Sequence, residues 1–230
     1  VQLVAISVDE ASKKYLDDFV KYSHLEKNAP KALNDLVYVR NQKEDKEFYE
    51  KIGLYAVPKI IVLNSKKEII KISKKITKIT KKYKVKFILN DSPEISKIVR
   101  ADGCHIGQSD RSIENTKKIL NKKIIGVTCH NSRRLAKIAF KNKVQYIAFG
   151  SFYSSKLKPN AKKANIRILS WAKKNIKKPI VAIGGITDKN YKKIIKAGAN
   201  YIAISSFIWD NPVLKPEFAI RKFKWKLQLL

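Results

Sequence analysis

Two aspartates, Asp91 and Asp110, stand just past the ends of short apolar segments that are typical of buried strands. Carboxylates at such strand ends can hold Mg²⁺, which keeps several of its water ligands and favours the phosphate oxygens of a substrate. The pair can therefore hold Mg²⁺, and Asn90 directly precedes Asp91. The structural alternatives are that one aspartate only caps a helix, as Asp110 before Arg111 could, and that Asn90 is a turn residue.

Two apolar runs later in the chain end in small residues. The run VAIGGI ends around Gly184 and Gly185, and the run IAISS ends with Ser205 and Ser206. Small residues let the backbone approach a ligand closely, and N–H groups at such a corner suit a phosphate. Two such corners side by side resemble the phosphate site formed by the last two strands of a (β/α)8 barrel. Tight packing of strand against helix is the structural alternative for the glycines.

The elements that would position these residues alternate regularly from residue 59 onward. Short β-rich runs are followed by segments whose apolar residues recur at helical spacing. This alternation predicts an α/β fold with a parallel sheet, and 230 residues suit one (β/α)8 TIM barrel. The expected strands are 59–63, 85–89, 103–107, 124–128, 144–149, 179–183 and 200–204, and the expected helices are 68–83, 93–100, 111–120, 132–141, 166–174, one ending at 196, and 216–224.

An eighth strand must come from the first 58 residues. Leu3 to Ile6 is the preferred choice, and Leu36 to Val39 is the alternative. With the run AVPKIIVL that follows it, this segment also has a thioredoxin-like appearance, although it lacks a CxxC motif. We expect residues 1–58 to be a divergent first β/α unit, with a thioredoxin-like remnant as the alternative, and residues 59–230 to form the remaining barrel.

Five motifs, in order along the chain, resemble thiamine-phosphate synthase and its TenI-like relatives. The resemblance implies a transferase that joins hydroxymethylpyrimidine pyrophosphate to thiazole phosphate, giving thiamine phosphate and pyrophosphate, with Mg²⁺ at the aspartate pair. It covers roughly residues 59 to 226. The motifs are VKFILND at 85–91, ADGCHIGQSD at 101–110, GVTCHNS at 126–132, YIAFGSFY at 146–153 and IGGIT at 183–187.

The resemblance also implies roles for residues beyond the aspartates. Lys158, Ser155 and Thr128 would act on the departing pyrophosphate, and Asn90 and Lys66 would bind substrate. The two corners of small residues would bind the monophosphate of the thiazole through their backbone N–H groups. The structural alternative for the lysines is a solvated surface position, since lysine is abundant throughout this chain.

Three positions depart from the family pattern. Leu157 stands where the family has the second Thr of Thr-x-Thr-Lys, and Val62 and Asn64 replace the Gln and Arg of Gln-Leu-Arg-x-Lys. Loss of a bidentate arginine favours the alternative function, a TenI-like thiazole phosphate tautomerase that works without Mg²⁺ and depends on His130. The retained aspartates and lysine favour the synthase. His105 alternates with core positions and is expected to be a satisfied residue of the barrel interior.

The charge composition suggests a third function. The formal net charge is +31, which is compatible with a nucleic-acid-binding protein. The basic residues are nearly all lysine and are spread over helix faces with few aromatics among them, so we attribute them to composition, and the positive field would still attract anionic substrates.

Composition also bears on compartment and assembly. The two cysteines lack a CxxC partner and no apolar run approaches a membrane span, so a cytoplasmic protein without a membrane partner is expected. A homo-oligomer is compatible with the sequence.

Overall fold

The computed structural model describes residues 3–7, 59–60, 66–82, 84–154, 161–215, 218–219 and 222–223. The segment 8–58 lies outside the described residues, and with it the alternative strand at Leu36 to Val39 and most of the thioredoxin-like hypothesis. Ser155 and Lys158 also lie outside the described residues.

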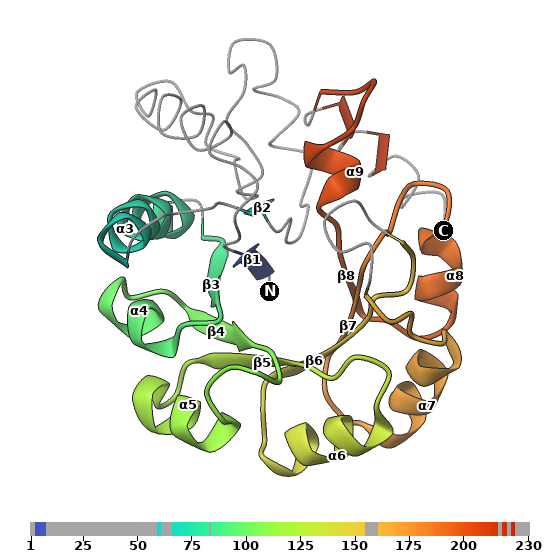
Figure 1. Ribbon diagram of the computed structural model, residues 1–230, viewed down its shortest axis with the longest axis horizontal. Coiled ribbons are helices and arrows are strands. Elements are labelled where there is room, and N and C mark those ends of the chain that lie inside the picture. Colours follow the sequence, from blue (N-terminus) through green and yellow to red (C-terminus); the bar gives the residue numbers. More distant parts are fainter. Residues whose placement is uncertain are drawn as a thin grey trace.

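A parallel sheet is the centre of the fold. Six of its strands, β3 to β8, follow one another in chain order and curl into an arc, with helices along the outer side (Figure 1). The predicted α/β class and the alternation from β3 onward are therefore confirmed. Pairing of β8 with β2, which would close a full barrel, is not found among the described residues. The six strands are β3 (Lys86–Asn90), β4 (Gly103–Ile106), β5 (Ile124–Thr128), β6 (Tyr146–Phe149), β7 (Ile180–Ile183) and β8 (Tyr201–Ala203).

The first strand is present but has unexpected neighbours. β1 (Leu3–Ser7) agrees with the preferred choice, and it lies between β2 (Lys59–Ile60) and β3. A regular barrel would have β2 next to β3, so the expected order is wrong at this point. The apolar strand β1 offers four registered pairs to β3, whereas the described residues of β2 pair at two positions with β1. The longer apolar strand therefore takes the interior position and β2 the outer one.

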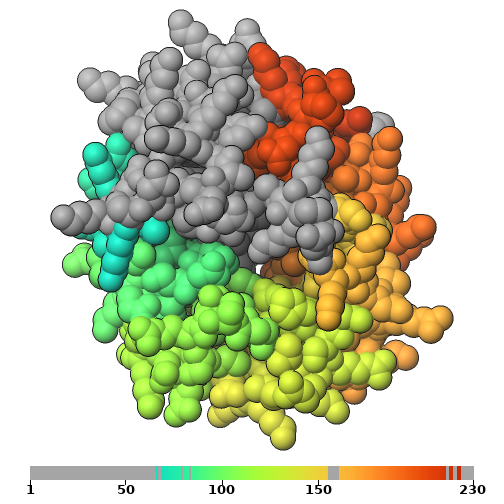
Figure 2. Space-filling model, in the orientation of Figure 1, coloured from blue at the N-terminus to red at the C-terminus, as the bar shows by residue number. Residues whose placement is uncertain are grey.

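Helices cover the outer side of the sheet in chain order (Figure 1), and the colours on the molecular surface follow the same order around the described part of the molecule (Figure 2). Most predicted helices are confirmed to within a few residues, whereas the short α9 was not predicted. The last expected helix, 216–224, lies largely outside the described residues. The helices are α3 (Lys66–Lys82), α4 (Pro93–Ile98), α5 (Ile113–Leu120), α6 (Arg133–Lys141), α7 (Arg167–Asn175), α8 (Tyr191–Lys196) and α9 (Ser206–Trp209).

The sheet separates two apolar layers. Successive residues of β6 point to opposite faces, so Ile147 and Phe149 join the large core beneath the helices, and Tyr146 and Ala148 belong to a small inner cluster with Val181. All four β6 residues are buried, which explains why this strand reads as a continuous apolar run rather than an alternating one.

One row of residues crosses the inner face of four strands. In the strand register, Asn90 pairs with His105, His105 with Gly126, and Gly126 with Tyr146. Gly126 is the one member of this row without a side chain, and a Cβ at that position would overlap the ring of Tyr146. The glycine therefore leaves the space that the tyrosine ring occupies.

Replacing this glycine tests the packing of the row. Gly126→Ala should lower the free energy of unfolding by about 1–3 kcal/mol, because the Tyr146 ring must leave its place in a close-packed interior. Urea denaturation measures the effect. In a Tyr146→Leu background the same substitution should lower the free energy of unfolding much less. An equal decrease in both backgrounds would show that the Tyr146 ring does not obstruct the alanine.

Candidate functional site

Asp91 directly follows β3 at its carboxyl end. Its N–H donates to the carbonyl of His105 at 2.8 Å, and its backbone has a φ of 64°, in the left-handed region that aspartate tolerates better than most residues. Ser92, not Asp91, caps α4, because the Ser92 hydroxyl accepts the N–H of Ile95. The exposed carboxylate of Asp91 is thus not the cap of this helix.

Asp110 lies in the loop after β4, and its carboxylate turns back toward that strand. Its Oδ2 accepts the N–H of Gly107 at 2.6 Å, which orients the group and leaves Oδ1 for another partner. The cap of α5 is Ser112, whose hydroxyl accepts the N–H of Asn115. The alternative that Asp110 only caps the helix is therefore wrong.

The two carboxylates lie around the same end of β4. Burial raises the pKa of the Cys104 thiol far above its ordinary value, and the nearby carboxylates of Asp91, Asp110 and Glu94 add to that effect. Arg111, which follows Asp110, also contacts the first turn of α4, because its Nε lies 2.6 Å from Glu94 Oε1. The structure therefore brings Asp91 and Asp110 to one edge of the sheet.

This pair suits one kind of metal ion. Within the part of the chain that the structure describes, no three His, Cys, Asp or Glu side chains converge on a closed metal site. Mg²⁺ needs no such site, because it is held by one or two carboxylates and completes its shell with waters and phosphate oxygens. Two carboxylates at one edge of the sheet are therefore a donor set that fits Mg²⁺.

A chain of hydrogen bonds links the interior to the end of β5. His105 Nδ1 lies 2.8 Å from the hydroxyl of Tyr146, and His105 Nε2 lies 2.7 Å from Oγ1 of Thr128. Gln108 Nε2 donates to the carbonyl of Thr128 at 2.6 Å. Both ring nitrogens of His105 have partners, so the expectation of a satisfied interior histidine is confirmed. Neither Tyr146 nor Gln108 was predicted as a functional residue.

Burial controls the charge of this histidine. The enclosed position lowers the pKa of His105 to about 4, although the nearby carboxylate of Asp110 acts in the opposite direction. Burial also raises the pKa of Tyr146 far above its ordinary value, so the phenol is neutral. Two neutral rings therefore meet beside Thr128, and they stack with centroids 5.5 Å apart.

Gly184 and Gly185 follow β7 and adopt φ values of 103° and 61°, which favour glycine. A Cβ on Gly184 would overlap Ser151, and one on Gly185 would meet the backbone of Tyr153 and Ser154. The loop after β6 thus packs against this corner, and the N–H of Tyr153 donates to the carbonyl of Gly184. Both glycines thus pack closely against a loop, whereas the structural alternative to phosphate binding had named a helix.

The second corner of small residues lies beside the first. β7 and β8 are paired, with Ile183 opposite Ala203, so Ser205 and Ser206 follow the neighbouring strand end. The predicted juxtaposition of the two corners is therefore confirmed. Ser206 is the first residue of α9, and both serines are partly exposed.

Other predicted residues are less informative. Lys66 is exposed at the first position of α3, and Asn90 is half-buried at the end of β3. The side chain of His130 is exposed, while its carbonyl accepts the N–H of Gly150 at 3.2 Å. For this histidine, the structure shows a backbone contact that connects the ends of β5 and β6.

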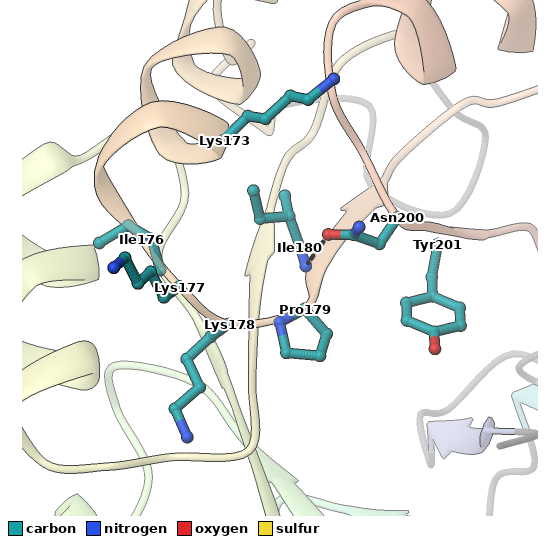
Figure 3. Close-up of a pocket in the computed structure, with 8 residues that line it drawn as sticks. All are labelled: Lys173, Ile176, Lys177, Lys178, Pro179, Ile180, Asn200 and Tyr201. Carbon is teal, nitrogen blue, oxygen red and sulfur yellow. Dashed lines mark hydrogen bonds between the residues drawn. The ribbon is translucent and has the colours of Figure 1, made fainter.

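A separate hollow lies at the opposite end of the strands. It has a volume of about 390 Å³ and is lined from α7 and the amino ends of β7 and β8, where Asn200 Oδ1 accepts the N–H of Ile180 (Figure 3). Lys173, Lys177 and Lys178 make its wall basic. The hollow does not belong to the site at the carboxyl ends.

Among the described helices, none is long and apolar enough to cross a membrane.

The buried histidine predicts a pH effect on stability. The pKa of His105 is about 4 in the folded chain and near 6.5 when unfolded, so between these values the unfolded chain binds more protons. Folding stability should fall as pH drops through this window, by up to about 3 kcal/mol from this group. Urea denaturation at several pH values measures it. In His105→Gln the free energy of unfolding should depend less steeply on pH between these values. Equal slopes in the two proteins would contradict the prediction.

Comparison with known proteins gives the family. A family model described as thiamine monophosphate synthase matches residues 36–208. The thiamine-phosphate synthase of Pelagibacter ubique is 47% identical over 191 residues, which is 80% of this chain and 92% of that protein. The synthase of Rhodospirillum centenum is 36% identical over 60% of this chain and 67% of its own length.

Solved structures agree on the fold. Thiamine phosphate pyrophosphorylase from Pyrococcus furiosus matches with a TM-score of 0.73 at 23% identity, covering 99% of this chain and 96% of that one. Orotidine 5′-phosphate decarboxylase from Pyrococcus horikoshii matches with a TM-score of 0.58 at 13% identity, covering 98% and 99%. The family match extends over most of the sequence and includes the strands that carry both aspartates. The chain belongs to the thiamine monophosphate synthase family.

Proposed function

We propose that this chain is a transferase that joins hydroxymethylpyrimidine pyrophosphate and thiazole phosphate to give thiamine phosphate and pyrophosphate. The observation that carries the proposal is the 47% identity to a thiamine-phosphate synthase across 92% of that protein. The paired carboxylates at one edge of the sheet and the two adjacent corners of small residues support it, because the reaction must hold a diphosphate and a monophosphate together.

The chemistry assigns a role to each group. The CH2–O bond of the pyrimidine breaks, its electron pair leaves with the pyrophosphate oxygen, and the lone pair of the thiazole nitrogen forms the new C–N bond. No general base is needed, because that nitrogen already carries a free lone pair. Electrostatic stabilisation of the leaving group and positioning of the two substrates are therefore the main tasks of the protein.

The leaving pyrophosphate would meet three kinds of group. Asp91 and Asp110 would hold Mg²⁺, which when bound neutralises negative charge on the phosphate oxygens. Lys158, Ser155 and Thr128 would bind the same oxygens directly. Of these groups, the two aspartates and Thr128 follow or end the neighbouring strands β3, β4 and β5, which supports a shared role.

Substrate binding would use the remaining residues. Asn90 would hydrogen-bond the pyrimidine, and Lys66 would add positive charge near its pyrophosphate. Gly184, Gly185, Ser205 and Ser206 would offer backbone N–H groups to the thiazole monophosphate. The formal charge of +31 would attract both anionic substrates to the protein.

We further propose that the sheet closes into a full (β/α)8 barrel, with residues 1–58 as its divergent first unit and residues 59–230 as the rest. The TM-score of 0.73 to a pyrophosphorylase over nearly the whole chain supports this arrangement. A cytoplasmic location and assembly into a homo-oligomer stay predictions, as does the absence of nucleic-acid binding. Negligible binding to random-sequence DNA at physiological salt would support the last of these.

The metal role predicts the effect of one substitution. Asp110→Asn should lower Mg²⁺-dependent formation of thiamine phosphate by about 100-fold or more, because the ion loses one of its two protein carboxylates. Both precursors are incubated with and without Mg²⁺, and the product is quantified by chromatography.

A surface carboxylate gives the matched control. Glu114 is exposed on α5 and lies 3.7 Å from Lys118, so Glu114→Gln should leave turnover unchanged. Full activity of Asp110→Asn would show that Asp110 does not bind the metal ion. Thiazole phosphate isomerisation that is indifferent to EDTA and is lost in His130→Ala would instead establish the tautomerase alternative.

A further inference from the structure

The hydrogen-bonded chain through His105 has a direction. In the described part of the structure, the hydroxyl of Tyr146 has His105 Nδ1 as its hydrogen-bond partner, at 2.8 Å. The phenol is buried, so its proton needs an acceptor, because a buried donor without a partner is destabilising. The Tyr146 hydroxyl therefore donates to Nδ1.

That donation determines the direction of the next hydrogen bond. A neutral imidazole that accepts at Nδ1 carries its hydrogen on Nε2. Nε2–H then donates to Oγ1 of Thr128 at 2.7 Å, which occupies a lone pair of that oxygen. The hydrogen of the Thr128 hydroxyl cannot point at His105, and it is left to donate to another group at the carboxyl end of β5.

We propose that His105 is a positioning residue: held by Tyr146 as the Nε2–H tautomer, it fixes the hydroxyl of Thr128 as a hydrogen-bond donor toward the anionic oxygens of the substrate. The proposal rests on the proposed function, because it supplies the group that Thr128 would serve. A donor that is already oriented costs no reorganisation when negative charge develops on the leaving group.

The surroundings hold this arrangement from two sides. Gly126 lies between His105 and Tyr146 in the strand register and leaves room for the tyrosine to reach across β5. Gln108 donates to the carbonyl of Thr128, which ties the end of β5 to the loop that carries Asp110. The end of β5 that carries Thr128 is thereby held next to the loop that carries Asp110.

Nitrogen NMR of histidine-labelled protein tests the tautomer without any substrate. The 15N shifts of a histidine ring distinguish a nitrogen that carries hydrogen from one that does not, and loss of one signal set in His105→Gln assigns this residue among the three histidines. The proposal requires the Nε2–H form in the unsubstituted chain. An Nδ1–H form or a charged ring would overturn it, whatever the catalytic activity. Tyr146→Phe should release the constraint and populate the Nδ1–H form.

Enzyme kinetics tests whether Tyr146 and His105 affect the reaction through Thr128. Tyr146→Phe should lower kcat about 10-fold with a change in KM below about threefold, since a neutral donor hydrogen bond that acts mainly in the transition state is lost. Thr128→Val should lower kcat by at least as much, and adding Tyr146→Phe to it should lower kcat no further. Multiplied losses in the double variant would show that Tyr146 acts independently and would overturn the proposal.

Tyr201 provides the matched control. It packs against the same inner cluster as Tyr146 but has no contact with His105 among the described interactions, so Tyr201→Phe should leave kcat and the tautomer unchanged. If the unsubstituted chain forms no thiamine phosphate, the proposed function fails, and the NMR result still decides the tautomer independently.

Discussion

Parallel pairing of β3, β4 and β5 is the constraint on which the candidate site depends. Their register places Asn90, His105 and Gly126 in one row, so the residues that follow these strands emerge at the same edge of the sheet. Asp91 follows β3, Asp110 follows β4, and Thr128 is the last residue of β5. A shift of one residue in any strand would turn its alternate side chains to the helix-covered face and separate these groups.

Close backbone packing shapes the same edge. Gly126 admits the ring of Tyr146, and Gly184 and Gly185 admit the loop after β6. These three glycines therefore make room for a side chain and a loop that lie about 20 residues or more from them in sequence. The ion pair between Glu94 and Arg111 acts similarly, because it joins the start of α4 to the loop that follows β4. Several short elements are thus held at the edge where the two carboxylates lie.

Apolar periodicity predicted the elements well because burial on a sheet or helix leaves a local pattern. Ile124–Thr128 matches β5 at both ends, and Ser132 begins the expected helix whose cap it forms. The strand at Leu3 was also predicted, but its place between β2 and β3 was not, because pairing partners depend on segments that are distant in sequence. The cap alternative for Asp110 stayed open for a different reason, because aspartate and serine both suit a helix start, and the structure has Ser112 as the cap of α5.

The sequence by itself determined the alternation of strands and helices, the two aspartates, the corners of small residues and the resemblance to one enzyme family, because each is a pattern of nearby residues. Only the tertiary structure decided that His105 lies between Tyr146 and Thr128, since these residues come from β4, β6 and β5 and meet across a glycine. The orientation of a hydroxyl depends on all of its neighbours in space. Here those neighbours come from strands that are distant in sequence, so no local sequence pattern predicts them.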